Sequence, residues 1–158
     1  MRYKEIEKNK EINAYLTKGN ANLGQLGFTD HSQAHCVQVA HQAGKILKRF
    51  GYSEHEIELA KIAGYMHDIG NAINRTHHAE YGALLANELL KDTDMSLEDR
   101  ITVVSAIGNH DESTGSPVDV ISAALIIADK TDVRRSRVRQ KERSAFDIHD
   151  RVNSVSYT

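Results

Sequence analysis

Apolar residues recur along most of the chain at the three- to four-residue spacing of amphipathic helices. Alternation with the period of two that marks a strand is seen only in the tail, at residues 152–157. The stretch 121–128 is apolar nearly all round, which is typical of a central, buried helix. We therefore predict an all-α fold, a compact bundle of five or more core helices. The expected helices span about 30–50, 54–68, 78–91 and 97–110, with a last one from about 119.

Turn and capping residues divide the rest of the chain. Residues 2–16 are predicted to form a charged helical arm. Residues 17–28 (TKGNANLGQLGF) contain three glycines and two asparagines, which predicts a loop. Thr29 or Asp30 would cap the next helix, and Ser53 with Glu56 matches a capping box for the one after it.

Composition indicates one ordinary globular domain. The 158 residues are 40% hydrophobic and 27% charged, with a formal net charge of -2. This balance does not point to nucleic acid or to an anionic membrane as a partner. No apolar run approaches the roughly 18 residues that span a bilayer, and the first residues do not resemble a signal peptide. A single cysteine, Cys36, excludes an internal disulfide and suits the cytoplasm.

Asp129 follows directly on the apolar stretch 121–128. An unpaired carboxylate buried there would cost several kcal/mol, about 2–7 for a neutral polar group and more for a charge. Two interpretations remain open, a metal ligand or an ion pair with Lys130 or a nearby arginine.

His35 lies on the apolar stripe of its helix, in line with Val39 and Ala43, where a histidine is either a hydrogen-bonded core residue or a ligand. His31 stands four residues earlier, so the two form an HxxxH pair. The third ligand and glutamate base of a zinc peptidase are absent, which argues against that use of the pair. Three further histidines are predicted to be solvated: His41, which falls off this apolar face, and His55 and His149, which lie in polar surroundings.

His67 and Asp68 are adjacent, immediately before Gly70. Neighbouring helical side chains point about 100° apart, so both reach one ion only at a helix end, which Gly70 supplies. The carboxylate of Asp68 could then bridge two ions. The alternative is a histidine that interacts with the dipole at a helix C-terminus.

His78 and His110 each stand at the start or end of a predicted helix, and either alone could be a surface histidine. The joint order along the chain is more informative: His35, His67-Asp68, His78, His110, Asp129. Four imidazoles and two carboxylates suffice for one or two divalent metals.

These residues resemble the HD superfamily of metal-dependent phosphohydrolases over about residues 31–135. Residues 67–70 (HDIG) match its name-giving motif, and His35 precedes a valine by four as in the family's first helix. Residues 78–82 (HAEYG) resemble the HPxxG segment of the HD-GYP branch, 109–111 (NHD) its HHE segment, and 127–129 (IAD) the final aspartate motif.

The resemblance implies an HD domain over residues 29–145, after an N-terminal arm and loop (1–28) and before a C-terminal tail (146–158). It implies a first metal bound by His35, His67, Asp68 and Asp129. It implies a second metal bound by His78, His110 and Asp68, so that Asp68 is shared. The sequence departs from HD-GYP proteins at Asn71, where lysine is usual, and at 113–117 (STGSP), where the GYP triad is missing. Specificity for cyclic dinucleotides is therefore not carried over.

The implied activity is hydrolysis of a phosphomonoester or phosphodiester, in a nucleotide or another small phosphorylated metabolite, by a metal-activated water. One or two ions of Mn, Fe, Ni, Co, Zn or Mg would serve. Two alternatives stay open: a mixed-valent di-iron oxygenase, which some HD-fold proteins with the same ligand set are, and a non-catalytic regulatory module.

Residues 130–143 hold seven basic and two acidic residues, a local charge of +5. Lys130 and Arg134 stand nearest the metal motif and are predicted to bind substrate phosphate. Lys130, Asp68 and Asp132 are the predicted catalytic residues, with Asp132 orienting a group or donating a proton. From Arg137 onward a solvated helix face is expected. The strand-like tail suggests one of two things: a chain that is part of a longer protein, or a homodimer formed by exchange of a strand.

Overall fold

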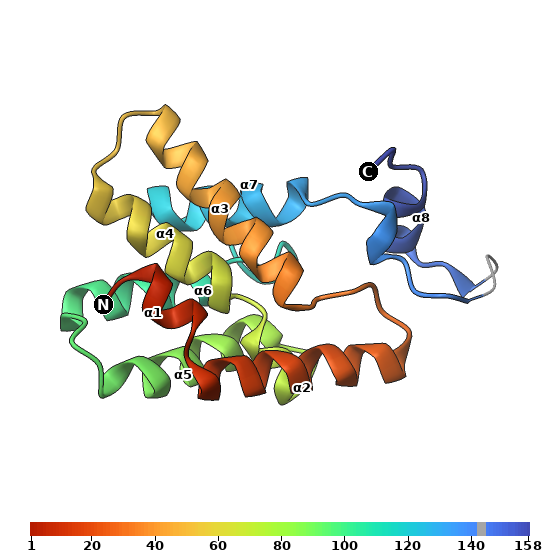
Figure 1. Cartoon of the computed structure of the whole chain (residues 1–158), viewed down its shortest axis with the longest axis horizontal. Helices are drawn as coiled ribbons and strands as arrows, with labels where there is room; N and C mark the ends of the chain where they lie inside the picture. The colour runs from red at the N-terminus through yellow and green to blue at the C-terminus, as the bar shows by residue number, and fades with distance from the viewer. Residues whose placement is uncertain (142–144) are drawn as a thin grey trace.

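The computed structural model describes residues 1–141 and 145–158, and within them it contains helices and no strands (Figure 1). The all-α prediction is confirmed. Glu142 and Arg143, the last residues of the predicted basic segment, lie outside the described residues, as does Ser144. The α-helices are α1 (Tyr3–Glu7), α2 (Lys10–Leu26), α3 (Gln33–Arg49), α4 (Glu54–Met66), α5 (His78–Lys91), α6 (Leu97–Gly108), α7 (Val120–Thr131) and α8 (Ile148–Ser154). Two 3₁₀ helices are η1 (Ile69–Ala72) and η2 (Arg135–Arg137).

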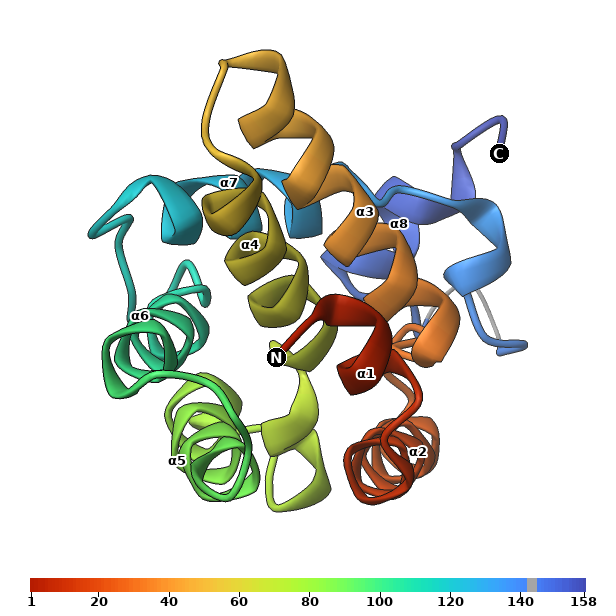
Figure 2. The same cartoon turned by 60° about the vertical axis from the view of Figure 1, so that its left-hand side comes forward.

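Helices α3 and α4 form the centre of the bundle, and α4 also contacts α1, α6 and α7 (Figure 2). The two helices approach closely at Gly64, where an added Cβ would lie 2.8 Å from the Cα of Ala40. Because α3 and α4 run in opposite directions, the beginning of α3 meets the end of α4 (Figure 1). His35 and His67 are thereby brought to the same end of the bundle.

Helix α7 packs against α3, α4 and α6, but it is buried on one face only. Ala124 and Leu125 are inaccessible, whereas Ile127 is 51% exposed, so the expectation of a helix buried all round is wrong. Its last turn carries Asp129 to the end of the bundle where α3 begins.

The predicted loop at 17–28 is wrong, because α2 continues to Leu26 and ends at Gly27, whose φ is 79°. The buried residues of α2 are spaced by three or four: Ile12, Leu16, Gly19 and Leu23. Gly19 belongs to this buried face, since an added Cβ would lie 3.0 Å from the backbone nitrogen of Ala72 in η1. The glycine permits close packing here and does not make a turn. The predicted arm over 2–16 is also divided, with Asn9 capping α2 by accepting hydrogen bonds from Glu11 and Ile12.

Two more predictions differ from the structure, one just before α3 and one in the C-terminal tail. Helix α3 begins after Ser32, and the carboxylate of Asp30 instead accepts hydrogen bonds from Ser32. The strand expected at 152–157 is wrong, because α8 covers Ile148–Ser154 with Asp147 as its N-cap. Val152 and Val155 are three residues apart, a spacing that fits one face of a helix, and the local capping box of Asp147 and Asp150 begins that helix.

None of the helices in the described ranges is both long enough and apolar enough to cross a membrane.

Candidate metal centre

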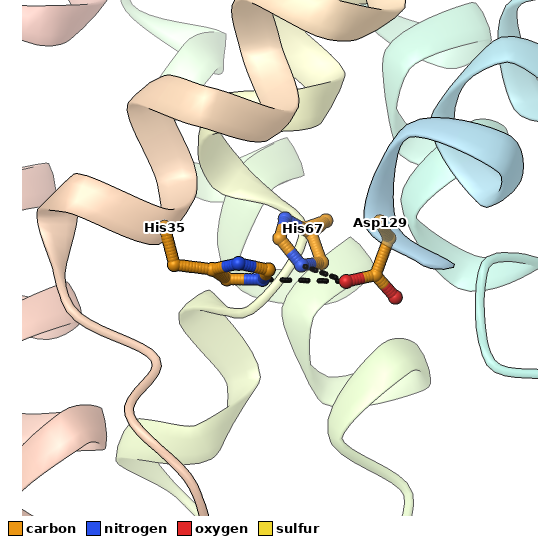
Figure 3. A group of neighbouring side chains, drawn as sticks. All are labelled: His35, His67 and Asp129. Carbon is orange, nitrogen blue, oxygen red and sulfur yellow. Dashed lines mark ion pairs between the residues drawn. The ribbon is translucent and has the colours of Figure 1, made fainter. Parts of the chain in front are cut away.

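The six predicted ligands meet at one end of the bundle, each at or near a helix terminus. They are His35 at the start of α3, His67 and Asp68 after α4, His78 at the start of α5, His110 just after α6 and Asp129 in the last turn of α7. Figure 3 shows His35 and His67 with their rings turned toward the carboxylate of Asp129. All but Asp129 are buried, and the side chain of Asp129 is 14% exposed.

Four of these side chains surround one point. Nε2 of His35 lies 3.2 Å from Oδ1 of Asp129, and Nε2 of His67 lies 3.5 Å from the same oxygen. Oδ2 of Asp68 lies 3.1 Å from Nε2 of His67 and 3.5 Å from Nε2 of His35. Two imidazole nitrogens and two carboxylate oxygens therefore converge, a donor set that suits a divalent transition metal.

A second group lies on the other side of Asp68. Nε2 of His78 is 3.2 Å from Nε2 of His110 and 3.8 Å from Oδ1 of Asp68. One carboxylate oxygen of Asp68 thus faces the first group and the other faces the second. The ligand atoms of His67, Asp68 and His110 also lie within 4.8 Å of one another, so the two groups are continuous.

The four imidazoles are held in one tautomer. Each Nδ1 contacts an oxygen that can only accept a hydrogen bond: Asp132 Oδ2 for His35 at 2.7 Å, Gly64 O for His67 at 2.8 Å, Arg75 O for His78 at 3.1 Å and Ile107 O for His110 at 2.6 Å. The proton is therefore assigned to Nδ1, which directs the Nε2 lone pair toward the centre of the cluster. The lone pairs of His78 and His110 then face each other, an arrangement that a cation between them would stabilise.

Three atoms at the centre have no hydrogen-bond partner among the described residues although they are buried: Nε2 of His35, Nε2 of His67 and Oδ2 of Asp68. Buried polar atoms are nearly always paired, because an unpaired one costs about 1–3 kcal/mol. Three such atoms that point at one another fit a bound metal ion, which would coordinate all of them.

The electrostatics of the cluster favour a positive charge. Burial of His67 opposes its protonation, but the carboxylates of Asp68 and Asp129 outweigh this and raise its pKa to about 10. Burial and repulsion from a charged His67 lower the pKa of His110 to about 4. Without a metal ion the ring of His67 would carry a second proton, on Nε2, in place of the lone pair that a metal ion would bind. The two carboxylates therefore favour one positive charge at this point.

Backbone geometry between α4 and α5 sets the position of Asp68 relative to His78. An added Cβ on Gly70 would lie only 1.9 Å from the carbonyl oxygen of His78. η1 can approach α5 this closely only because residue 70 is glycine. His77, which precedes the ligand, adopts a left-handed φ of 61°, uncommon for any residue other than glycine.

Asp132 supports the cluster through His35. Besides accepting from His35, its carboxylate is bound by Arg134, with Nε at 2.5 Å from Oδ1 and Nη2 at 2.8 Å from Oδ2. Burial opposes charge on Asp132, but the bonds from His35 and Arg134 hold its pKa below the usual range. Asp132 is therefore positioned to orient His35, and both roles predicted for it stay predictions.

Replacement of Asp132 by asparagine is expected to weaken metal binding by about 10- to 100-fold, because a carboxylate behind a ligating histidine fixes the ring and raises its basicity. Competition against a chelator of known affinity would measure this. Arg134→Gln, which keeps the carboxylate, should change the affinity no more than a few-fold. Metal binding by Asp132→Asn equal to that of the original protein would contradict the orienting role.

The basic residues in the last turn of α7 and after it make different contacts. Lys130 contacts Oδ2 of Asp129 at 2.9 Å and Glu112 at 2.7 Å, so the expected ion pair is present. Oδ1 of Asp129 faces His35 and His67, and its use as a metal ligand stays a prediction. Arg134 is engaged with Asp132. The expectation of a solvated face from Arg137 onward is wrong: Arg137 is 7% exposed and donates to the carbonyls of Asp30 and Asp132, and Arg139 donates to Phe28. These arginines join the chain after α7 to the loop before α3.

A cavity of about 360 Å³ opens onto the cluster. Its lining includes Asp68, His78, His110, Asp129, Lys130 and Asp132, all predicted, and two residues not predicted for the site, His31 and Arg75. Nε2 of His31 lies 4.0 Å from Oδ2 of Asp68, so the HxxxH pair does place both imidazoles beside one carboxylate. His41, His55 and His149 are exposed as predicted, although His149 also lines the cavity.

Arg75 is the cationic residue that sequence reasoning missed. Its Nη1 lies 3.9 Å from Oδ1 of Asp68 and 3.3 Å from the side-chain oxygen of Asn71, and its guanidinium stacks 5.6 Å from the Phe28 ring centroid. It belongs to an irregular segment without periodicity, so its only signal was its place three residues before His78.

The HD-domain family model matches residues 33–143. An uncharacterised protein of Methanocaldococcus jannaschii is 28% identical over 94% of this chain and 66% of its own length. Ribonuclease Y of the Aster yellows witches'-broom phytoplasma is 33% identical over 75% of this chain. This chain corresponds to only 22% of that ribonuclease.

The fold has a counterpart of known structure. The crystal structure of a predicted HD superfamily hydrolase from an uncultured Thermotogales bacterium aligns with a TM-score of 0.60 at 24% identity. The alignment covers 85% of this chain and 75% of that one.

Proposed function

The chain belongs to the HD-domain family, and we propose that it is a metal-dependent phosphohydrolase that acts on a small phosphorylated metabolite such as a nucleotide. The observation that carries this proposal is the convergence of His35 Nε2, His67 Nε2 and Asp68 Oδ2, all buried and without hydrogen-bond partners among the described residues.

The donor set fits two divalent ions. His35, His67, Asp68 and Asp129 would hold the first, and His78, His110 and Asp68 the second. Mixed imidazole and carboxylate donors suit Mn, Fe, Ni, Co or Zn better than Mg. Metal ions in such a site lower the pKa of a water molecule and polarise phosphoryl oxygens.

Two cations that line the cavity would bind the phosphate. Burial opposes charge on Lys130, but Asp129 and Glu112 outweigh it and raise its pKa, so the ammonium group stays charged. Arg75 presents a guanidinium group, whose fork of donors matches phosphate oxygens, to the same cavity. We propose that Lys130 and Arg75 orient the phosphate against the ligand cluster, while Asp132 keeps the proton of His35 on Nδ1. Arg134, which was predicted to bind substrate, would instead act through Asp132.

The size of the cavity favours a small substrate. About 360 Å³ lies within the range of roughly 300–1,000 Å³ found for small-molecule sites. The name of ribonuclease Y points to RNA for that protein, and hydrolysis of a phosphodiester in RNA is a second candidate here. The net charge of -2 favours the small substrate, because nucleic-acid binding usually relies on an excess of basic residues. A cytoplasmic location and a homodimer stay predictions from the sequence.

A metal-supplemented screen over phosphomonoesters, phosphodiesters and a short RNA would test the proposal. We expect hydrolysis of small phosphate esters, and Lys130→Ala should raise KM by about tenfold or more, as loss of one charge-assisted hydrogen bond costs about 1.5–3 kcal/mol. Glu88→Ala, a change on the exposed side of α5, should leave KM unchanged.

Absence of hydrolysis on all substrates, together with a di-iron spectrum in anaerobically purified protein, would overturn the proposal in favour of the oxygenase alternative. Absence of both would favour a regulatory module.

A further inference from the structure

Helix α8 carries an exposed apolar stripe. Ile148, Val152 and Val155 follow one another by four and three residues and so lie on one face, and they are 68%, 45% and 73% exposed. The first two line the cavity at the metal-ligand cluster, together with Val133, whereas Val155 does not. Figure 1 shows α8 at the end of the bundle where α7 terminates.

Polar contacts hold α8 in this position. The carboxylate of Asp150 is inaccessible to solvent and pairs with Lys141 at 2.5 Å. Asn153 accepts a hydrogen bond from the backbone nitrogen of Arg134 at 2.7 Å, and Ser156 donates to the carbonyl of Val133. The helix is thus anchored without use of Ile148 or Val152, which remain free to contact a ligand.

The residues that line the cavity include two chemically different kinds. Lys130, Arg75 and Arg137 are cationic and lie near Asp129, Asp68 and Asp132. Ile148, Val152 and Val133 are aliphatic, and His149 and Asn153 of α8 also line the cavity. A phosphate ester with a flat or apolar organic group has the same division of charge. Small-molecule sites combine an apolar lining with a few polar groups in this way.

We propose that Ile148 and Val152 bind the organic group of the substrate, so that the protein selects phosphate esters with a flat or apolar group, such as a nucleobase. This inference rests on the proposed phosphate site, and it assigns the substrate's uncharged part to α8. Burial of such a group against the two side chains removes apolar surface from water on both partners.

Two phosphonates that cannot be hydrolysed test this directly, phenylphosphonate and methylphosphonate. They carry the same anionic group and differ in the apolar one. We expect the metal-loaded protein to bind phenylphosphonate about tenfold more tightly in calorimetric titration, a ratio of the size expected when apolar area of this kind is buried. Ile148→Ser and Val152→Ser should each reduce that ratio several-fold, with little effect on methylphosphonate. Val155→Ser, on the same stripe but outside the cavity, should keep the ratio.

Equal affinities for the two phosphonates, or a ratio unchanged in Ile148→Ser and Val152→Ser, would overturn the inference. If these variants instead shifted the sedimentation coefficient from dimer to monomer at an unchanged ratio, the stripe would belong to a contact with a second copy of the chain, which also overturns it. Failure of both phosphonates to bind would contradict the phosphate site itself and with it both proposals, whereas binding of both without preference would leave the proposed function in place.

Discussion

Replacing Asp68 with alanine is expected to remove hydrolysis of phosphate esters by roughly 1,000-fold or more, the scale seen when one member of a catalytic unit is lost. Asp68 turns one carboxylate oxygen toward each group of ligands, with Oδ2 3.1 Å from His67 and Oδ1 3.8 Å from His78. Its loss would therefore weaken both metal positions, whereas loss of His78 or Asp129 would affect one directly.

Metal content and activity should be measured on the same samples of Asp68→Ala. We expect less than one ion per chain after dialysis, with the helical circular dichroism preserved. Asp68→Asn is the matched control for shape, because it keeps the volume but lacks the charge, and it should lose activity to a similar degree. Full activity in Asp68→Ala would show that the assignment of the centre is wrong.

Replacing Gly70 with alanine should destabilise the protein by about 3 kcal/mol or more, at the upper end of the cost of overpacking. The new methyl group would lie 1.9 Å from the carbonyl oxygen of His78 and 2.5 Å from the nitrogen of Gly82. Both are backbone atoms, which cannot move aside by changing a rotamer. η1 would have to withdraw from α5, and Asp68 would move away from His78.

Thermal unfolding measures this effect, and a drop in Tm of roughly 6–12 °C is expected for a domain of this size. Gly108→Ala is the matched control, since its Cβ would meet only the side chain of Ala83, at an ordinary 3.4 Å. A Tm for Gly70→Ala that matches the control would mean that η1 and α5 do not approach as described.

Helices were predicted correctly from the sequence where capping residues and apolar spacing agreed with the packing of the helices. Ser53 and Glu56 form the predicted capping box, and α5 begins and ends where its periodicity does. In α2 the local and tertiary signals conflicted, because Gly19 suggested a turn but serves contact with η1. Glycine composition alone does not separate these two uses.

The candidate site could be located from sequence because its residues stand at helix ends in a fixed order. The structure brings all six together. It also shows long-range contacts that the spacing of apolar residues does not predict. Asp132 reaches His35 across 97 positions of sequence, and Arg137 joins Asp30 across 107. Such long-range hydrogen bonds depend on the arrangement of the helices, which the pattern of apolar residues does not specify. The same holds for Arg75 and for the two residues of α8 that line the cavity, Ile148 and Val152.

The metal stoichiometry of the purified protein, determined together with its Tm in chelator, tests the account most directly. Ligand binding to the folded state raises stability, so removal of bound ions should lower Tm. We predict about two transition-metal ions per chain and a clear fall in Tm when they are chelated. A protein that binds no metal and has the same Tm with and without chelator would contradict the metal centre, and with it the proposed activity.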